Sequence, residues 1–136
     1  MSCVSIVEVT FDKNGKPIKY HLVCSGKCDD GSECVNRSVP NQHGGVREWC
    51  GCPTGDEPTK CHTVIYRHGH GESHPGKHVI LCAGGCDEPQ HCTLVEGDNS
   101  KPVPEDPEDG WLPEWKVYPQ YKDKTIFVRC QCRKLR

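Results

Sequence analysis

Twelve cysteines carry the most specific chemical signal in this chain of 136 residues. They form two sets of six, with successive steps of 21, 4, 6, 16 and 2 residues and then of 21, 4, 6, 38 and 2. Four of the five steps repeat, so we interpret the chain as an internal duplication of one cross-linked module. The sets are Cys3, Cys24, Cys28, Cys34, Cys50 and Cys52, and Cys61, Cys82, Cys86, Cys92, Cys130 and Cys132.

Three kinds of cysteine chemistry fit this pattern, and structural disulfides fit it best. Each set holds an even number of cysteines, and modules of 57 and 79 residues with few large apolar side chains need cross-links or metal to be stable. Six cysteines allow many pairings, and the spacing does not select one. Cys3 and Cys24 lie at the two ends of a predicted hairpin and could face each other, as could Cys61 and Cys82.

Structural zinc and thiol exchange are the alternatives. The Cys-x2-Cys knuckle typical of zinc sites is absent, and six thiolates per module exceed the four ligands of one tetrahedral site. A redox pair at Cys50 and Cys52, or at Cys130 and Cys132, would need an exposed thiolate of low pKa, often at the start of a helix. The sequence predicts no helix there. We therefore expect all twelve cysteines to form structural disulfides.

A second candidate chemistry lies in a cluster of histidines within one predicted turn. Neutral imidazoles on a glycine-rich loop bind Zn²⁺ or Cu²⁺, and Glu72 could add a carboxylate ligand. The alternative is a polar, solvated hairpin tip. The sequence favours the solvated tip and no cofactor. If a metal does bind, the sequence predicts a weak surface site for zinc or copper at His68, His70, His74 and His78.

Aromatic residues gather in a stretch that only the second module contains, at about residues 95–124. Its first part is rich in proline and acidic residues, which is typical of an exposed arm. Exposed aromatic side chains suit a protein contact or a sugar-stacking surface; alternatively they fold back and cover a small core. The residues predicted to bind a partner are Trp111, Trp115, Tyr118 and Tyr121.

Strands must position these groups. Alternation of apolar and polar residues within Val4–Val23, interrupted by Asn14-Gly15, predicts a β-hairpin, because Asn-Gly is a strong hairpin-turn signal. Each module then closes on a further strand that carries Cys-x-Cys, whose two sulfurs leave the same face. The second hairpin is predicted from His62–Tyr66, Gly69–Gly76 and His78–Leu81, the closing strands from Val46–Cys52 and Thr125–Cys132, and the linker from Gly51–Lys60.

The predicted fold is therefore a small, disulfide-rich, all-β protein. It consists of two tandem duplicated modules, residues 1–57 and 58–136, and each module is a β-hairpin followed by a cysteine loop and a third strand. We expect Trp49, next to Cys50, to be a packing residue.

The sequence favours a binding or assembly protein over an enzyme. No catalytic constellation is recognisable, a net charge of −2 gives no field for nucleic acid, and no apolar run reaches the ~20 residues of a membrane span. We predict an extracellular or cell-surface protein, secreted although the chain opens without a signal peptide. We expect it to bind a protein partner or to self-associate through exposed β-strand edges, and such self-association could form a filament. Carbohydrate is a further class of partner. The first alternative is a protein that binds zinc or copper through its cysteines, its histidines or both, and that is cytoplasmic if the cysteines hold the metal. A protease inhibitor is the second alternative.

Overall fold

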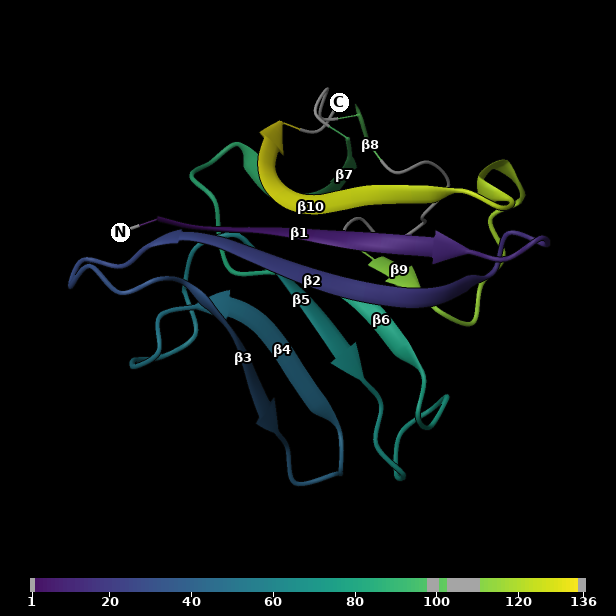
Figure 1. Ribbon diagram of the computed structural model, residues 1–136, viewed down its shortest axis with the longest axis horizontal. Helices are drawn as coiled ribbons and strands as arrows, with labels where there is room; N and C mark the ends of the chain where they lie inside the picture. The colour runs from purple at the N-terminus through teal and green to yellow at the C-terminus, as the bar shows by residue number, and fades with distance from the viewer. Residues whose placement is uncertain (1, 98–100, 103–110, 135–136) are drawn as a thin grey trace.

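The computed structural model describes residues 2–97, 101–102 and 111–134, and strands dominate it (Figure 1). The one helical element within these ranges is a 3₁₀ turn. The elements in chain order are β1 (Ser2–Phe11), β2 (Pro17–Lys27), β3 (Val35–Pro40), β4 (Val46–Gly51), β5 (His62–Arg67), β6 (His78–Ala83), β7 (Gln90–Glu96), β8 (Lys101–Pro102), β9 (Trp111–Pro113), η1 (Pro119–Tyr121) and β10 (Thr125–Lys134).

Two antiparallel sheets make up the fold, with the strand orders β2-β1-β10-β7-β8 and β3-β4-β5-β6-β9. In Figure 1, β1, β2 and β10 run across the view, and the strands β3 to β6 of the second sheet cross them obliquely. Each sheet takes strands from both halves of the sequence, because β10 pairs with β1 and β4 pairs with β5. The first hairpin therefore lies in one sheet and the second hairpin in the other.

The strand registers of the two sheets correspond. Positions in the hairpin strands are related by a shift of 58 residues, and positions in the closing strands β4 and β10 by a shift of 80, because of the insertion. The corresponding pairs are Val7 with Leu22 and with Val128, and Ile65 with Ile80 and with Glu48. Each half thus supplies a hairpin, a further strand and a closing strand in the same order, and the second half adds the short strands β8 and β9.

The predicted fold class, a small disulfide-rich all-β protein, is confirmed. Both hairpins and both closing strands form where the sequence predicted them. Four further strands were not predicted: β3 and β7, which pair with the closing strands β4 and β10, and the short strands β8 and β9. The predicted boundary between residues 57 and 58 divides the sequence into two halves, but strands from both halves share each sheet.

A hydrophobic core fills the space between the sheets. Alternate side chains of each strand point inward, so Val7, Val9 and Leu22 of the first hairpin meet Ile65 and Ile80 of the second. The inserted segment also contributes to this core through three buried side chains, Leu112, Tyr118 and Tyr121. Part of the insertion therefore belongs to the folded body. Its residues 103–110, which include most of the predicted acidic arm, lie outside the described residues.

All twelve cysteines form disulfides, and each half uses the same connectivity: first to fourth, second to fifth, third to sixth. The expectation that Cys3 faces Cys24 and that Cys61 faces Cys82 is wrong. The hairpin register places Cys3 opposite Gly26 and Cys24 opposite Ser5, so the two sulfurs cannot meet. The bonds are Cys3–Cys34, Cys24–Cys50, Cys28–Cys52, Cys61–Cys92, Cys82–Cys130 and Cys86–Cys132.

Two of these disulfides cross from one sheet to the other. Cys24 on β2 bonds to Cys50 on β4, and Cys82 on β6 bonds to Cys130 on β10. All four side chains belong to the core or pack directly against it. The sheets are thus joined covalently twice, once within each half of the chain.

The first hairpin turn is fixed by contact with the insertion. Gly15 has a φ of +86°, its carbonyl accepts a 2.7 Å hydrogen bond from the backbone N–H of Tyr118, and a Cβ atom there would collide with the Tyr118 carbonyl group. We expect Gly15→Ala to destabilise the protein by more than the ~1–2 kcal/mol that a left-handed alanine usually costs. Thermal or urea unfolding would measure the loss.

Gly31 provides the matched control for Gly15. It has a φ of +87°, but a Cβ atom at this residue would have no neighbour within 4 Å, so Gly31→Ala should cost only the backbone penalty. Equal losses in the two variants would mean that the Tyr118 contact does not constrain the turn.

Candidate functional site

The histidine-rich turn and the inserted aromatic segment meet at one end of the second sheet. The ring of His74 stacks on Trp115 with a centroid distance of 4.0 Å and an interplanar angle of 3°. His68 meets the same indole edge-on at 5.2 Å and also contacts Tyr66 at 5.1 Å. We call Tyr66, His68, His74 and Trp115 the histidine–tryptophan cluster. Two features that the sequence predicted separately therefore form one surface.

Hydrogen bonds to Glu72 hold the turn that carries this cluster. The Glu72 carboxylate accepts hydrogen bonds from the Tyr66 hydroxyl and, at 2.8 Å, from the Gly69 backbone N–H. These bonds lower the pKa of Glu72, the Tyr66 bond most, whereas partial burial and then the Glu72 contact raise the pKa of Tyr66. Asn41, in the turn between β3 and β4, donates to the Tyr66 oxygen at 2.7 Å. Glu72 is thus a structural partner of the turn.

The four predicted metal-binding histidines do not converge. His68 and His74 lie at Trp115, and His70 is exposed. His78 points elsewhere, with its Nδ1 atom 3.1 Å from Glu114 and its ring against Tyr20. Within the described residues, the sulfurs of bonded cysteines make up every group of three possible metal ligands whose atoms lie within 4.8 Å of one another.

One histidine nevertheless has the ring orientation of a metal ligand. The Nδ1 atom of His68 lies 3.2 Å from the Lys77 carbonyl oxygen. Because a carbonyl only accepts, Nδ1 is the donor in this contact, and Nε2 is the ring nitrogen that carries the lone pair whenever the imidazole is neutral. Metal-binding histidines are usually oriented by this kind of hydrogen bond.

The four aromatic residues predicted to bind a partner occupy different environments. Trp115 is half-buried in the histidine–tryptophan cluster. Tyr118 and Tyr121 are only 4% and 6% exposed and pack with Phe11 in the core, which matches the alternative that they cover it. Trp111 pairs through its backbone with Leu81, and its side chain lies outside what the structure describes. Trp115 is thus the one of the four that the structure places at a described surface site.

The two halves differ in how their sheet edges are covered. Beyond β7 and β6 of the second half lie the short strands β8 and β9. The first half supplies the other two edges, β2 and β3, and no strand of the described ranges pairs with their outer sides. β3 has five exposed residues of six, including Val35 and Val39 at 38% and 42% exposed.

A cavity of about 540 Å³ lies under the linker between the halves. Its rim is held by Glu57, which accepts two 2.7 Å hydrogen bonds from Arg47 and lies 2.7 Å from His62 Nε2. The Arg47 guanidinium is the main cause that lowers the pKa of Glu57. The sequence alone does not reveal this network, because its members are polar residues on separate segments and no motif connects them. The network anchors the linker to β4 and β5.

Trp49 is buried, as predicted for a packing residue. The Arg37 guanidinium lies over its ring at 5.6 Å from the centroid, and Arg37 also donates to the Cys52 and Gly55 carbonyl oxygens. The linker thus closes over the outer face of the second sheet.

Comparison of the chain with protein-family models, with curated proteins and with solved structures finds no match. Among the described residues, none forms a helix of the length and apolarity that crossing a membrane requires.

Proposed function

We propose that this protein is a non-enzymatic, extracellular binding or assembly protein that associates through an open sheet edge. The observation that carries the proposal is the combination of six disulfides with two edge strands in the first half, β2 and β3, that no described strand covers. Disulfides persist in oxidising compartments, and small secreted domains use them to replace a large core. Unpaired strand edges offer backbone donors and acceptors to a strand of another molecule.

β3 suits strand addition better than β2. Natural edges are commonly protected by lysine, and β2 carries Lys19 and Lys27 whereas β3 carries no lysine. Val35 and Val39 of β3 are exposed and lie two residues either side of Arg37, which is bound to the linker. A strand added to β3 would cover both valines and extend the second sheet. The partner that we propose is a second copy of this chain.

Sedimentation velocity across a concentration series tests this association. The wild-type protein is expected to form dimers or longer species as its concentration rises, and Val35→Lys is expected to remain monomeric. Val35 lies opposite Gly51, so the new lysine meets no cross-strand side chain.

Phe127→Lys is the matched control for the edge. Phe127 is 51% exposed on the central strand β10 and lies opposite Glu8, so a lysine there is compatible with the fold. This variant should associate like the wild type. A wild-type protein that stays monomeric at every concentration would contradict the proposal, and so would association lost only in Phe127→Lys.

A second candidate function is transition-metal binding at the histidine–tryptophan cluster, and the contact of His68 Nδ1 with the Lys77 carbonyl oxygen favours it. We expect Cu²⁺ to quench the fluorescence of Trp115, because His74 stacks on that indole at 4.0 Å. His68→Ala with His74→Ala should abolish most of this quenching. His21→Ala, which removes an exposed histidine of β2, should leave it unchanged. Equal quenching in all three proteins would exclude the site.

A further inference from the structure

Two disulfides in each half pack against each other. The sulfurs of Cys3, Cys28 and Cys34 all lie within 4.8 Å of one another, although only Cys3 and Cys34 share a bond. Cys28 is bonded to Cys52, so four sulfurs gather at one place. Cys28 and Cys34 are buried, and Cys3 is half-buried.

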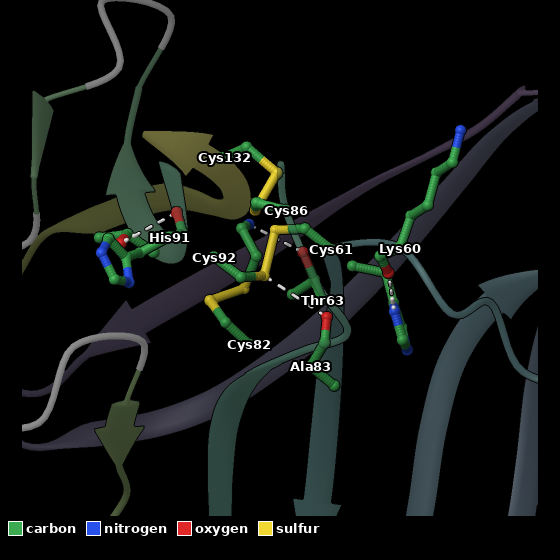
Figure 2. Close-up of a disulfide and its surroundings, with 12 residues drawn as sticks. Lys60, Cys61, Thr63, Cys82, Ala83, Cys86, His91, Cys92 and Cys132 are labelled. Atoms are coloured by element: carbon green, nitrogen blue, oxygen red, sulfur yellow. Dashed lines mark hydrogen bonds between the residues drawn. A yellow bond between two sulfur atoms is a disulfide. The ribbon is translucent and has the colours of Figure 1, made fainter. Parts of the chain in front are cut away.

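The second half repeats this arrangement at the corresponding positions. The sulfurs of Cys61, Cys86 and Cys92 lie within 4.8 Å of one another, and Cys86 is bonded to Cys132. Figure 2 shows the Cys61–Cys92 bond next to the Cys86–Cys132 bond, with the latter two residues entering from different segments. The two clusters of four sulfurs are thus a property of the shared connectivity.

We propose that each cluster becomes a four-thiolate metal site when its two disulfides are reduced, so that the reduced chain binds two zinc ions. One site would use Cys3, Cys28, Cys34 and Cys52, and the other the corresponding four cysteines of the second half: Cys61, Cys86, Cys92 and Cys132. The proposal concerns the reduced chain and does not depend on the extracellular binding function or on the edge strand β3.

Three of the four sulfurs of each cluster need only a small adjustment to bind one ion. Zinc binds thiolate sulfur at about 2.3 Å in a tetrahedron, which places neighbouring sulfurs about 3.8 Å apart. Three sulfurs of each cluster already lie within 4.8 Å of one another, and the fourth, that of Cys52 or Cys132, is bonded to one of these three. The two disulfides of a cluster bring distant segments together, because Cys3 and Cys52, which belong to different bonds, lie at opposite ends of the first half. A metal ion would join the same segments as the two bonds it replaces.

The chemistry balances with a thiol reductant. Two disulfides take up four electrons from two molecules of a dithiol, which become oxidised, and give four cysteine thiols. Binding of one Zn²⁺ displaces the four thiol protons, because thiolates are the ligands. Each site then carries a formal charge of −2.

The third disulfide of each half is excluded from the site. Cys24–Cys50 and Cys82–Cys130 cross the core between the sheets, and none of their four sulfurs belongs to a group of three within 4.8 Å or is bonded to a member of such a group. This difference makes the proposal testable, since an unfolded chain with twelve thiolates has no reason to leave these four cysteines out.

The experiment reduces the full chain with a phosphine in metal-free buffer and titrates it with Zn²⁺ against a chromogenic chelator. We expect two ions per chain and a strand-type circular dichroism spectrum in the zinc-bound form. Alkylation followed by mass spectrometry should label Cys24, Cys50, Cys82 and Cys130 and leave the other eight protected. Replacing Zn²⁺ by Co²⁺ should give the visible absorption of tetrahedral thiolate coordination.

Two paired variants sharpen the result. Cys28→Ser with Cys52→Ser should reduce the stoichiometry from two ions to one, whereas Cys24→Ser with Cys50→Ser should leave it at two. Three ions per chain, protection of all twelve cysteines, or an equal loss in both paired variants would show non-specific thiolate binding and overturn the proposal. Absence of zinc binding would also overturn it, and none of these outcomes bears on association through β3.

Discussion

Replacing Cys82 and Cys130 together by alanine is expected to lower the free energy of unfolding by about 4 kcal/mol. This disulfide joins residues 48 positions apart, and the chain-entropy cost of opening a loop of that length is of this size. It also joins β6 to β10 across the core, so its loss removes one of the two covalent links between the sheets. Urea unfolding under non-reducing conditions would measure the change.

The corresponding bond of the first half is the natural comparison. Cys24–Cys50 spans 26 residues, so removing it should cost about 3.5 kcal/mol, slightly less than the longer loop. A loss below about 1 kcal/mol in both paired variants would mean that non-covalent packing alone holds the sheets together. The outcome would then contradict the view that disulfides replace a large core in this chain.

Cutting the linker between Cys52 and Cys61 is expected to leave the two halves in one complex. The six disulfides all lie within a half, while the pairings of β1 with β10 and of β4 with β5 join the halves without a covalent bond. A protease site placed at residues 53–56, which are exposed, allows the cut in the folded protein. Size-exclusion chromatography should show one peak, and a non-reducing denaturing gel should show two fragments.

A cut elsewhere serves as the control. The exposed turn at Gln42–Gly44 lies inside the loops closed by Cys24–Cys50 and Cys28–Cys52. After cleavage there, a non-reducing denaturing gel should still show one species, which separates only on reduction. A single band after the linker cut would contradict the connectivity. Two separate peaks in native chromatography would show that the shared sheets are too weak to hold the halves together.

Local signals in the sequence were enough to predict both hairpins. Asn14-Gly15 and the alternation around it specify the first turn, and the repeated cysteine spacing extends that prediction to the second half. β3 was missed because Val35–Pro40 contains three polar residues in sequence and ends in proline. Its partner β4 supplies the pairing, which no local pattern reveals. The exchange of closing strands between the sheets was missed for the same reason, since it depends on tertiary contacts.

The sequence predicts the two segments that form the candidate site, but it does not predict that they meet. Composition identified the histidine turn and the tryptophan segment, but His74 and Trp115 are 41 residues apart and meet only because β9 pairs with β6. Composition also does not distinguish Trp115, which lies at the surface site, from Tyr118 and Tyr121, which are buried in the core as packing residues. Both tyrosines are buried because their rings pack against Phe11, which lies at the end of β1 in the first hairpin.

The equal registers of the two sheets have a consequence for how this chain finds its structure. If the halves were separate molecules, they would need to meet by diffusion, and their stability would vary with concentration. Eight residues between Cys52 and Cys61 tether them instead. A short tether of this kind gives an effective concentration in the millimolar range. The two halves therefore share strands in the way that two subunits of an intertwined dimer do. Because they belong to one chain, however, their folding does not depend on protein concentration.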